Sequence, residues 1–223
     1  MKTLKKLIAV LTLCCLFSFA FSGCIETKPY TPSDESLFEF TLLEDGTYAI
    51  SAKVDADLPE IVNLPKEYSD KAVTAVLENA FKGTAVKEVR IPATIKVVGK
   101  NAFYGCESLT SVYFYKGVEE IQAGAFYGCK GIKELNLPSS LKIVGDSAFS
   151  GISITRLKLT EKVTTVGNYA FAYCENLIEV YISHSVSSLA STAFDGANEA
   201  IEFEISASNA YYKLDANGMP VAK

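Results

Sequence analysis

Few side chains in this 223-residue chain are suited to catalysis or metal binding. His184 is the only histidine, so an imidazole general base or a histidine metal site would have to depend on it. It stands between Ser183 and Ser185 at the end of a predicted strand, where we expect a solvated loop histidine. The chain contains no Gly-x-Ser-x-Gly, phosphate-loop or His-Glu-x-x-His motif. The sequence therefore predicts no catalytic residue, no cofactor and no enzyme activity.

Three cysteines, Cys106, Cys129 and Cys174, follow the same turn of an internal repeat. Cys106 and Cys129 lie one repeat apart, so their Cα atoms are expected within disulfide distance. Parallel side chains on neighbouring rungs seldom meet the required dihedral angle, however, and a buried ladder of free thiols is favoured. The sequence leaves open whether the two are bonded. No cysteines have the close paired spacing of a zinc site, so no metal is expected.

Residues 1–23 are predicted to be a secretory signal. A basic start is followed by an apolar run, Leu7 to Phe21, that is short for a membrane span. The run ends in "FSGC", which resembles the bacterial lipobox, and this resemblance implies that Cys24 becomes a lipid-modified first residue. Two or three acyl chains anchor a protein durably to a membrane. The alternative is ordinary secretion, with Cys24 as a spare thiol.

The mature chain is acidic. The signal contains three of the 21 lysines and arginines and none of the 26 acids, so 18 basic side chains remain against 26 acidic ones. Such a surface repels phosphate backbones, and we expect no nucleic-acid partner. Residues 24–36 are mostly polar, contain two prolines and are expected to form a flexible tether.

The elements that must position any site repeat along the chain. Ala-Phe pairs recur at spacings of 22 or 23 residues, with the phenylalanines at positions 81, 103, 126, 149, 171 and 194. Each unit also contains a short strand pattern, such as "LTSVYF" (109–114) and "IKELNLP" (132–138). Strict spacing in this range is typical of a solenoid, which we place at 61–206, with the six phenylalanine rings in an internal column.

Segments at both ends are expected to close the solenoid. Residues 37–60 contain two alternating apolar runs around Asp45-Gly46, which predicts a capping β-hairpin. Residues 207–223 are expected to form a C-terminal cap or tail.

The repeats "NAFYGCESLTSVYF" and "GAFYGCKGIKELNLPSSLKIVGDSAF" resemble the BspA-type leucine-rich repeat family of bacterial surface proteins. This resemblance implies a leucine-rich repeat solenoid of the α/β class. It would consist mainly of short parallel β-strands with turns and short helical segments, in a period of 22–23. The family includes adhesins that bind host matrix proteins, so the resemblance implies a binding role, although function belongs to sites rather than folds.

Outward positions of the predicted strands vary while the inward ones stay apolar. The candidate ligand-binding residues are Tyr113, Tyr115, Asn136, Arg156, Lys158 and Tyr181. A plain solvated face of mixed charge is the alternative. We expect a non-catalytic binding module, lipid-anchored to the bacterial cell envelope, that acts as an adhesin on a protein ligand such as host extracellular matrix. The second hypothesis is a glycan-binding accessory lipoprotein that recognises a surface glycan.

Overall fold

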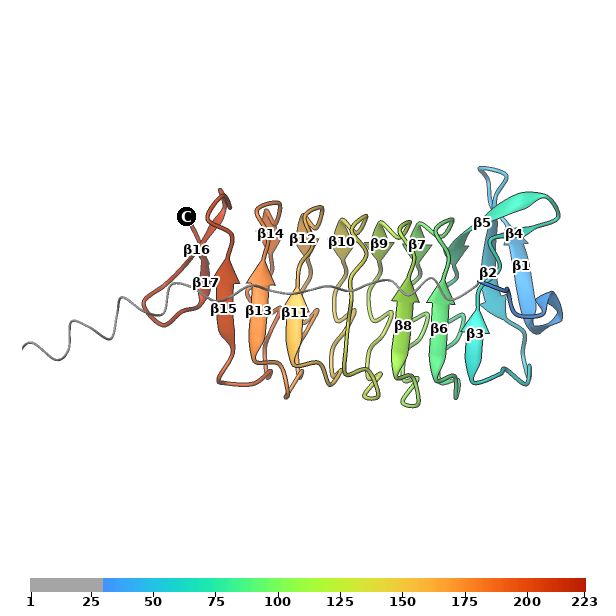
Figure 1. The fold of residues 1–223 in the computed structure, drawn as a ribbon, viewed down its shortest axis with the longest axis horizontal. Coiled ribbons are helices and arrows are strands. Elements are labelled where there is room, and N and C mark those ends of the chain that lie inside the picture. The colour runs from blue at the N-terminus through green and yellow to red at the C-terminus, as the bar shows by residue number, and fades with distance from the viewer. Residues whose placement is uncertain (1–29) are drawn as a thin grey trace, which may run out of the picture. The chain divides into compact units, whose positions relative to one another are not determined.

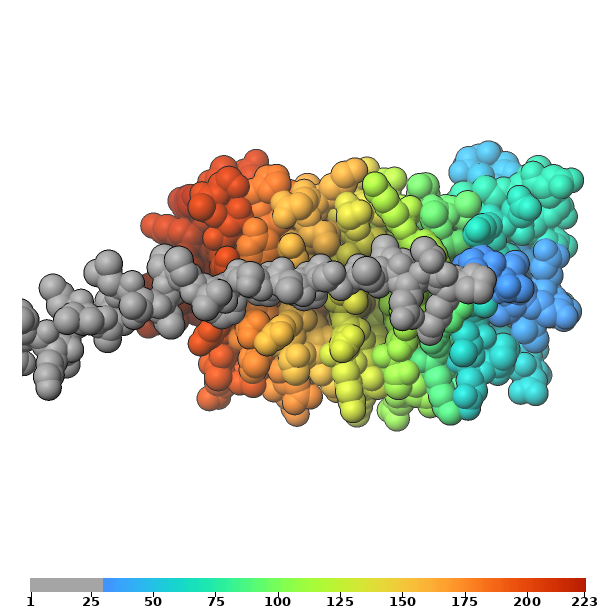
Figure 2. Space-filling model, in the orientation of Figure 1, coloured from blue at the N-terminus to red at the C-terminus, as the bar shows by residue number. Residues whose placement is uncertain are grey.

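The computed structural model describes residues 30–223, and nearly all of the regular structure there is β-strand. The one helix in this part of the chain is the 3-10 turn η1 (Glu35–Leu37). The chain forms coils, each running from one Ala-Phe pair to the next. The coils follow one another in chain order along one axis, as Figure 1 and Figure 2 show from the blue end to the red end.

Each coil contributes to two faces. The back sheet has the order β1-β2-β5-β7-β9-β10-β12-β14, with β4 paired to β5. Its strands are β1 (Phe38–Leu42), β2 (Tyr48–Ala52), β4 (Glu67–Tyr68), β5 (Lys71–Val76), β7 (Val97–Val98), β9 (Glu120–Ile121), β10 (Ile143–Val144), β12 (Thr165–Val166) and β14 (Ser188–Leu189).

The opposite strands form what we call the front face. They make two three-stranded sheets, β3-β6-β8 and β11-β13-β15. Their bounds are β3 (Ile61–Asn63), β6 (Glu88–Ile91), β8 (Ser111–Phe114), β11 (Arg156–Lys158), β13 (Glu179–Ile182) and β15 (Glu202–Ile205). A separate pair, β16 (Tyr212–Leu214) and β17 (Pro220–Ala222), lies beyond β15 in the sequence.

Neighbouring coils pair in parallel with equivalent residues opposite one another. In the back sheet, Val98, Ile121, Val144, Val166 and Leu189 form one continuous inward row. All but the last of these side chains are buried. The coil length is therefore set so that each apolar side chain meets its counterpart in the next coil.

The Ala-Phe segments are turns rather than the expected short helical segments. Phe81 N donates to Ala102 O (2.7 Å), and Gly83 N donates to Tyr104 O (2.8 Å) in the next coil. The same alternation continues from coil to coil, with Phe103 N donating to the Ala125 carbonyl. Since alternate N–H groups bind a neighbouring coil, they are not available for the i to i−4 bonds of an α-helix. These turns add a third set of bonds between coils.

The predicted phenylalanine column is confirmed. Rings at positions 81, 103, 126, 149, 171 and 194 stack nearly parallel, with successive centroids 5.1, 5.1, 5.2, 5.5 and 5.8 Å apart. The first five are fully buried, and Phe194 at the C-terminal end is half-buried. The column is the centre of the core cluster.

A β-hairpin covers the N-terminal end, as the sequence predicts. Strands β1 and β2 pair antiparallel, and β2 then pairs in parallel with β5 of the first coil. Phe38 of the hairpin lies edge-on to Phe81, with centroids 6.3 Å apart, and so extends the aromatic column. The residues before the hairpin also contact the fold, because Ser33 N donates to Asn63 O of β3 (2.9 Å).

The buried side chain of Asn209 ties down the C-terminal segment. Its amide donates to Ser183 O (2.8 Å) and Val186 O (3.1 Å), while its Oδ1 accepts from the N–H groups of Tyr211 and Tyr212. All four bonds are local or reach one coil back. They satisfy backbone groups that the last coil would otherwise leave unpaired.

Phe126 should be a major contributor to stability. Its ring stacks between two neighbours in mid-column, so Phe126→Ala leaves a cavity that no chain end can close, and we expect a loss of about 3–5 kcal/mol in the free energy of unfolding. Urea titration followed by circular dichroism measures this loss. Phe194→Ala, at the half-buried end of the column, should cost clearly less. Equal losses for the two variants would show that a ring's position in the column does not determine its contribution to stability.

Candidate functional site

The parallel register brings the candidate residues into rows on the front face. Arg90 pairs with Tyr113, and Lys158, Tyr181 and Glu204 form the corresponding row on the other sheet. Inward residues alternate with these positions and are buried. Tyr113 is 44% exposed, which confirms that its ring points away from the core.

In the first front sheet, Tyr113 lies against a cation that is itself fixed. Arg90 Nη2 lies 2.6 Å from Glu88 Oε1, and both side chains are mostly covered, with 11% and 16% exposed. The guanidinium lies 5.9 Å from the centroid of the Tyr113 ring. This cation–π contact orients the tyrosine and leaves part of its ring open to solvent.

The second front sheet brings together three of the other candidates. Arg156 Nε lies 2.9 Å from Glu179 Oε2, across the β11–β13 pair. Lys158 Nζ lies 5.4 Å from the centroid of the Tyr181 ring. Arg156 remains largely exposed, with 60% of its side chain accessible, whereas Lys158 and Tyr181 are half-buried. Exposed ion pairs of this kind contribute little to stability, so the Arg156 side chain is not needed to hold β11 and β13 together.

The remaining two candidates lie at the junction between the two sheets. Asn136 is exposed on the segment 133–137, and Tyr115 is half-buried immediately after β8. Tyr115 occupies the strand-end position that a buried proline, Pro92 or Pro138, takes in neighbouring coils. The structure thus places Tyr115 beside the outward rows rather than within them.

The predicted strand at 132–138 is wrong. No residue of 133–137 forms a backbone hydrogen bond to another residue in the described range 30–223, and the front face is divided there. Val112, Leu135 and Leu137 next to this break are 8–9% exposed, whereas their counterparts Val89 and Leu159 are fully buried. The front face is therefore slightly open at its centre.

Phe114 supplies a physical reason for this break. The equivalent residues in other coils are aliphatic: Ile91, Leu137, Leu159 and Ile182. The Phe114 ring instead packs edge-on against Phe126, with centroids 5.9 Å apart and an interplanar angle of 82°. A ring needs more room than an aliphatic side chain, so we infer that Phe114 keeps 133–137 from pairing with β8.

His184 has a partner that the sequence did not suggest. Its Nδ1 lies 2.7 Å from Glu161 Oε2 in the preceding coil, and both side chains are exposed. The neighbouring hydroxyls are already used, since Ser183 Oγ donates to Thr160 O and Ser185 Oγ donates to Val163 O. The pair has the acid and base of a hydrolytic triad but no serine hydroxyl that it could activate among the residues described.

The three cysteines are free and buried. Cys106 Sγ donates to Phe81 O (3.0 Å), and Cys129 Sγ donates to Phe103 O (3.1 Å), so each thiol binds a carbonyl of the preceding coil. Burial raises the pKa of the Cys174 thiol to about 12. Within residues 30–223 there is no group of three or more metal-ligating side chains. The thiol ladder, rather than a disulfide, is confirmed.

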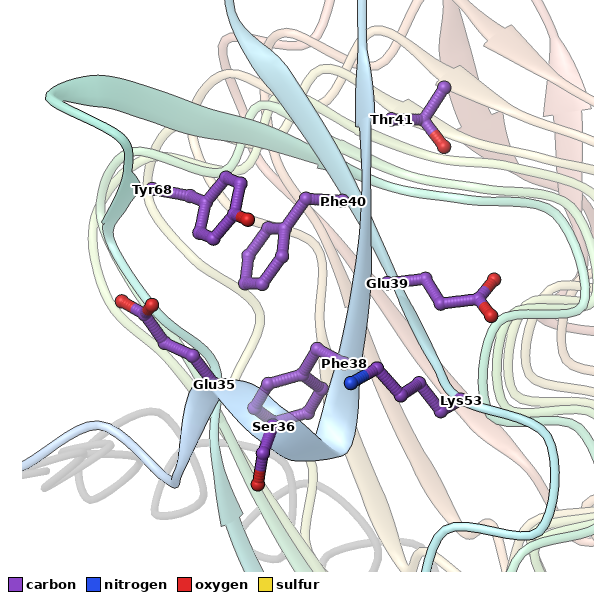
Figure 3. A pocket seen from close by; sticks show the side chains of 8 residues that line it. All are labelled: Glu35, Ser36, Phe38, Glu39, Phe40, Thr41, Lys53 and Tyr68. Atoms are coloured by element: carbon purple, nitrogen blue, oxygen red, sulfur yellow. The ribbon is translucent and has the colours of Figure 1, made fainter.

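A shallow hollow lies in the N-terminal cap. Figure 3 shows the side chains that line it, Glu35, Ser36, Phe38, Glu39, Phe40, Thr41, Lys53 and Tyr68. Phe40 and Tyr68 stack face to face with centroids 3.9 Å apart, and Phe38 is buried beneath. Because the Phe40 and Tyr68 rings already pack against each other, we interpret the hollow as part of the cap.

The fold and its variable outer rows define a leucine-rich repeat solenoid. Residues 74–202 match the BspA type leucine rich repeat region in six copies. The chain therefore belongs to the BspA-type leucine-rich repeat family. A comparison with curated proteins finds no match. No helix within the described range 30–223 has the length and apolarity to cross a membrane.

Solved structures show the same fold. A leucine-rich repeat protein of T. pallidum has 22% identity and a TM-score of 0.64, over 78% of this chain and 86% of that chain. A leucine-rich repeat protein from Bacteroides ovatus has 26% identity and a TM-score of 0.61, over 79% of this chain and 52% of that chain. The pneumococcal vaccine antigen PcpA has 20% identity and a TM-score of 0.59, over 83% of this chain and 52% of that chain. The matched region thus spans about half the length of the last two proteins.

Replacing Phe114 should restore the front sheet. In Phe114→Leu, an aliphatic side chain like that of the other coils allows 133–137 to pair, so its amides should exchange with solvent more slowly in hydrogen-exchange mass spectrometry. The reverse change, Leu159→Phe, should accelerate exchange in β13. Unchanged exchange in both variants would show that the break has another cause.

Proposed function

We propose that this protein is a non-catalytic binding module that presents its front face to a protein ligand at the bacterial cell envelope, as an adhesin. The observation that carries this proposal is the contrast between rows of the same strands. The inward row is uniformly apolar, with Val89, Val112, Leu135, Leu157, Val180 and Phe203. The outward row beside it changes from each coil to the next, with Arg90, Tyr113, Asn136, Lys158, Tyr181 and Glu204.

Stability alone accounts for the inward row, because truncation there leaves cavities. Stability does not require the two tyrosines, the arginine, the lysine, the asparagine and the glutamate of the outward row. Tyrosine and arginine are enriched where binding energy concentrates in protein interfaces. Tyr113, Asn136 and Arg156 are exposed, so a partner can reach them without unfolding any part of the solenoid. We infer that a folded protein, with host extracellular matrix as the proposed class, contacts the front face, including Arg156 of the neighbouring outward row.

A glycan is the second candidate ligand. Arg90 covers one side of the Tyr113 ring, and the exposed remainder could stack on a sugar ring. The chain contains no tryptophan, the side chain with the largest aromatic face, which favours a protein ligand. A glycan array probed in parallel with matrix proteins separates the two proposals.

The front-face tyrosines should be needed for binding and not for folding. Tyr113→Ala and Tyr181→Ala remove outward rings, so we expect melting temperatures within a few degrees of wild type and loss of binding to a panel of immobilised matrix proteins. Tyr127→Ala, an exposed tyrosine on the Ala-Phe edge, is the matched control and should bind normally. If the two front-face variants also bind normally, the front face is not the binding surface.

The membrane anchor is a separate proposal. Cys24 lies outside the described residues, and the proposal depends on the basic start, the apolar run and the "FSGC" sequence. Cys24→Ser cannot form the thioether to a lipid, so it should yield a soluble protein or an uncleaved precursor. Detergent-phase partitioning measures this. A signal-cleaved Cys24→Ser protein that still partitions like wild type would contradict lipidation.

A further inference from the structure

Two tyrosines on the Ala-Phe edge have an unusual backbone conformation. Tyr169 and Tyr173 each have φ of 56°, in the left-handed region. The other non-glycine residues with positive φ in the described range are Asp, Asn or Ser, whose short polar side chains tolerate this region. A bulky aromatic residue there is strained, and such strain is concentrated at functional sites.

The other coils form the same turn with residues that adopt a positive φ more readily. The position of Tyr173 is occupied by Gly83, Gly105, Gly128, Gly151 and Gly196. The position of Tyr169 is Asn79 or Asn101 in the first coils. The fifth coil alone has tyrosine at both places, and both side chains remain exposed.

The Tyr173 ring is supported on one face and open on the other. A Cβ atom at Gly196 in the next coil would lie 2.7 Å from both Cδ1 and Cε1 of the ring, so the ring rests directly on that glycine. The side chain is nevertheless 58% exposed, and Tyr169 is 43% exposed. The ring therefore forms a platform that presents its outer face to solvent.

An exposed aromatic ring face attracts cations. Elsewhere the chain supplies its own, since Lys82 Nζ lies 5.2 Å from the Tyr104 centroid and Lys158 Nζ lies 5.4 Å from that of Tyr181. Residues 163–212 contain no lysine or arginine, and no cation of residues 30–223 lies over Tyr169 or Tyr173. The acids of that stretch are Glu175, Glu179, Asp195, Glu199, Glu202 and Glu204.

We propose that Tyr169 and Tyr173 form a second binding surface, on the turns between β12 and β13, for lysine or arginine side chains of a basic protein segment. The electron-rich ring face attracts a cation, and Glu175 and Asp195, which lie on the neighbouring turn positions, raise its local concentration. This surface is distinct from the front face, because its residues come from the Ala-Phe turns. The charge of the last coils identifies the partner as cationic.

The test uses the purified full chain and a fluorescein-labelled octapeptide of alternating arginine and glycine. Fluorescence anisotropy should show binding that weakens at high salt. Tyr173→Gly, which restores the residue of the other coils, should weaken binding about tenfold, since a cation–π contact contributes on this scale. Its melting temperature should equal or exceed that of wild type. Tyr169→Asn should weaken binding in the same way.

Two controls make the result decisive. Tyr127→Ala, on the same edge but in a coil rich in lysine, should leave peptide affinity unchanged. A matched octapeptide of glutamate and glycine should not bind. The proposal is overturned if Tyr173→Gly binds the arginine peptide like wild type, since the acidic charge alone would then account for peptide binding. It is also overturned if Tyr173→Gly melts early, which would make the tyrosine structural, or if a neutral oligosaccharide binds this edge and the peptide does not.

Discussion

The whole structure depends on each coil burying its apolar side against the next. A coil of 22 or 23 residues cannot enclose its own core, so the phenylalanine rings stack from coil to coil at 5.1–5.8 Å. Backbone bonds between coils run along the back sheet, the front face and the Ala-Phe turns. Inward residues therefore must repeat, while outward residues carry no such constraint.

This constraint makes departures from the repeat informative. Phe114 is a ring where the other coils have aliphatic side chains, and the front face is divided beside it. Tyr173 stands where the other coils have glycine, and it keeps the left-handed backbone with its ring exposed. A solenoid can accept such changes at single positions because each coil contacts only its neighbours, so the effect of a change stays local.

The two ends and the charge distribution complete this arrangement. Phe38 of the hairpin extends the aromatic column at one end, and Asn209 binds the carbonyls of Ser183 and Val186 one coil back at the other. Charged side chains are unevenly spread, since residues 163–212 contain acids and no lysine or arginine. Cations of the front face, by contrast, lie against their own tyrosines or acids. Different regions of one scaffold can thus present different chemistry to partners.

The sequence by itself determined the solenoid, the phenylalanine column, the capping hairpin and which strand residues point outward, because these follow from a fixed period and from alternation. Only the tertiary structure decided the break at 133–137, next to the place where Phe114 of one coil packs edge-on against Phe126 of the next. It also decided that the Ala-Phe segments are turns, since their N–H groups bind a neighbouring coil. The pairing of His184 with Glu161 and the platform of Tyr173 on Gly196 likewise join residues one coil apart. Local patterns do not encode such contacts, because they depend on how two coils are placed against each other.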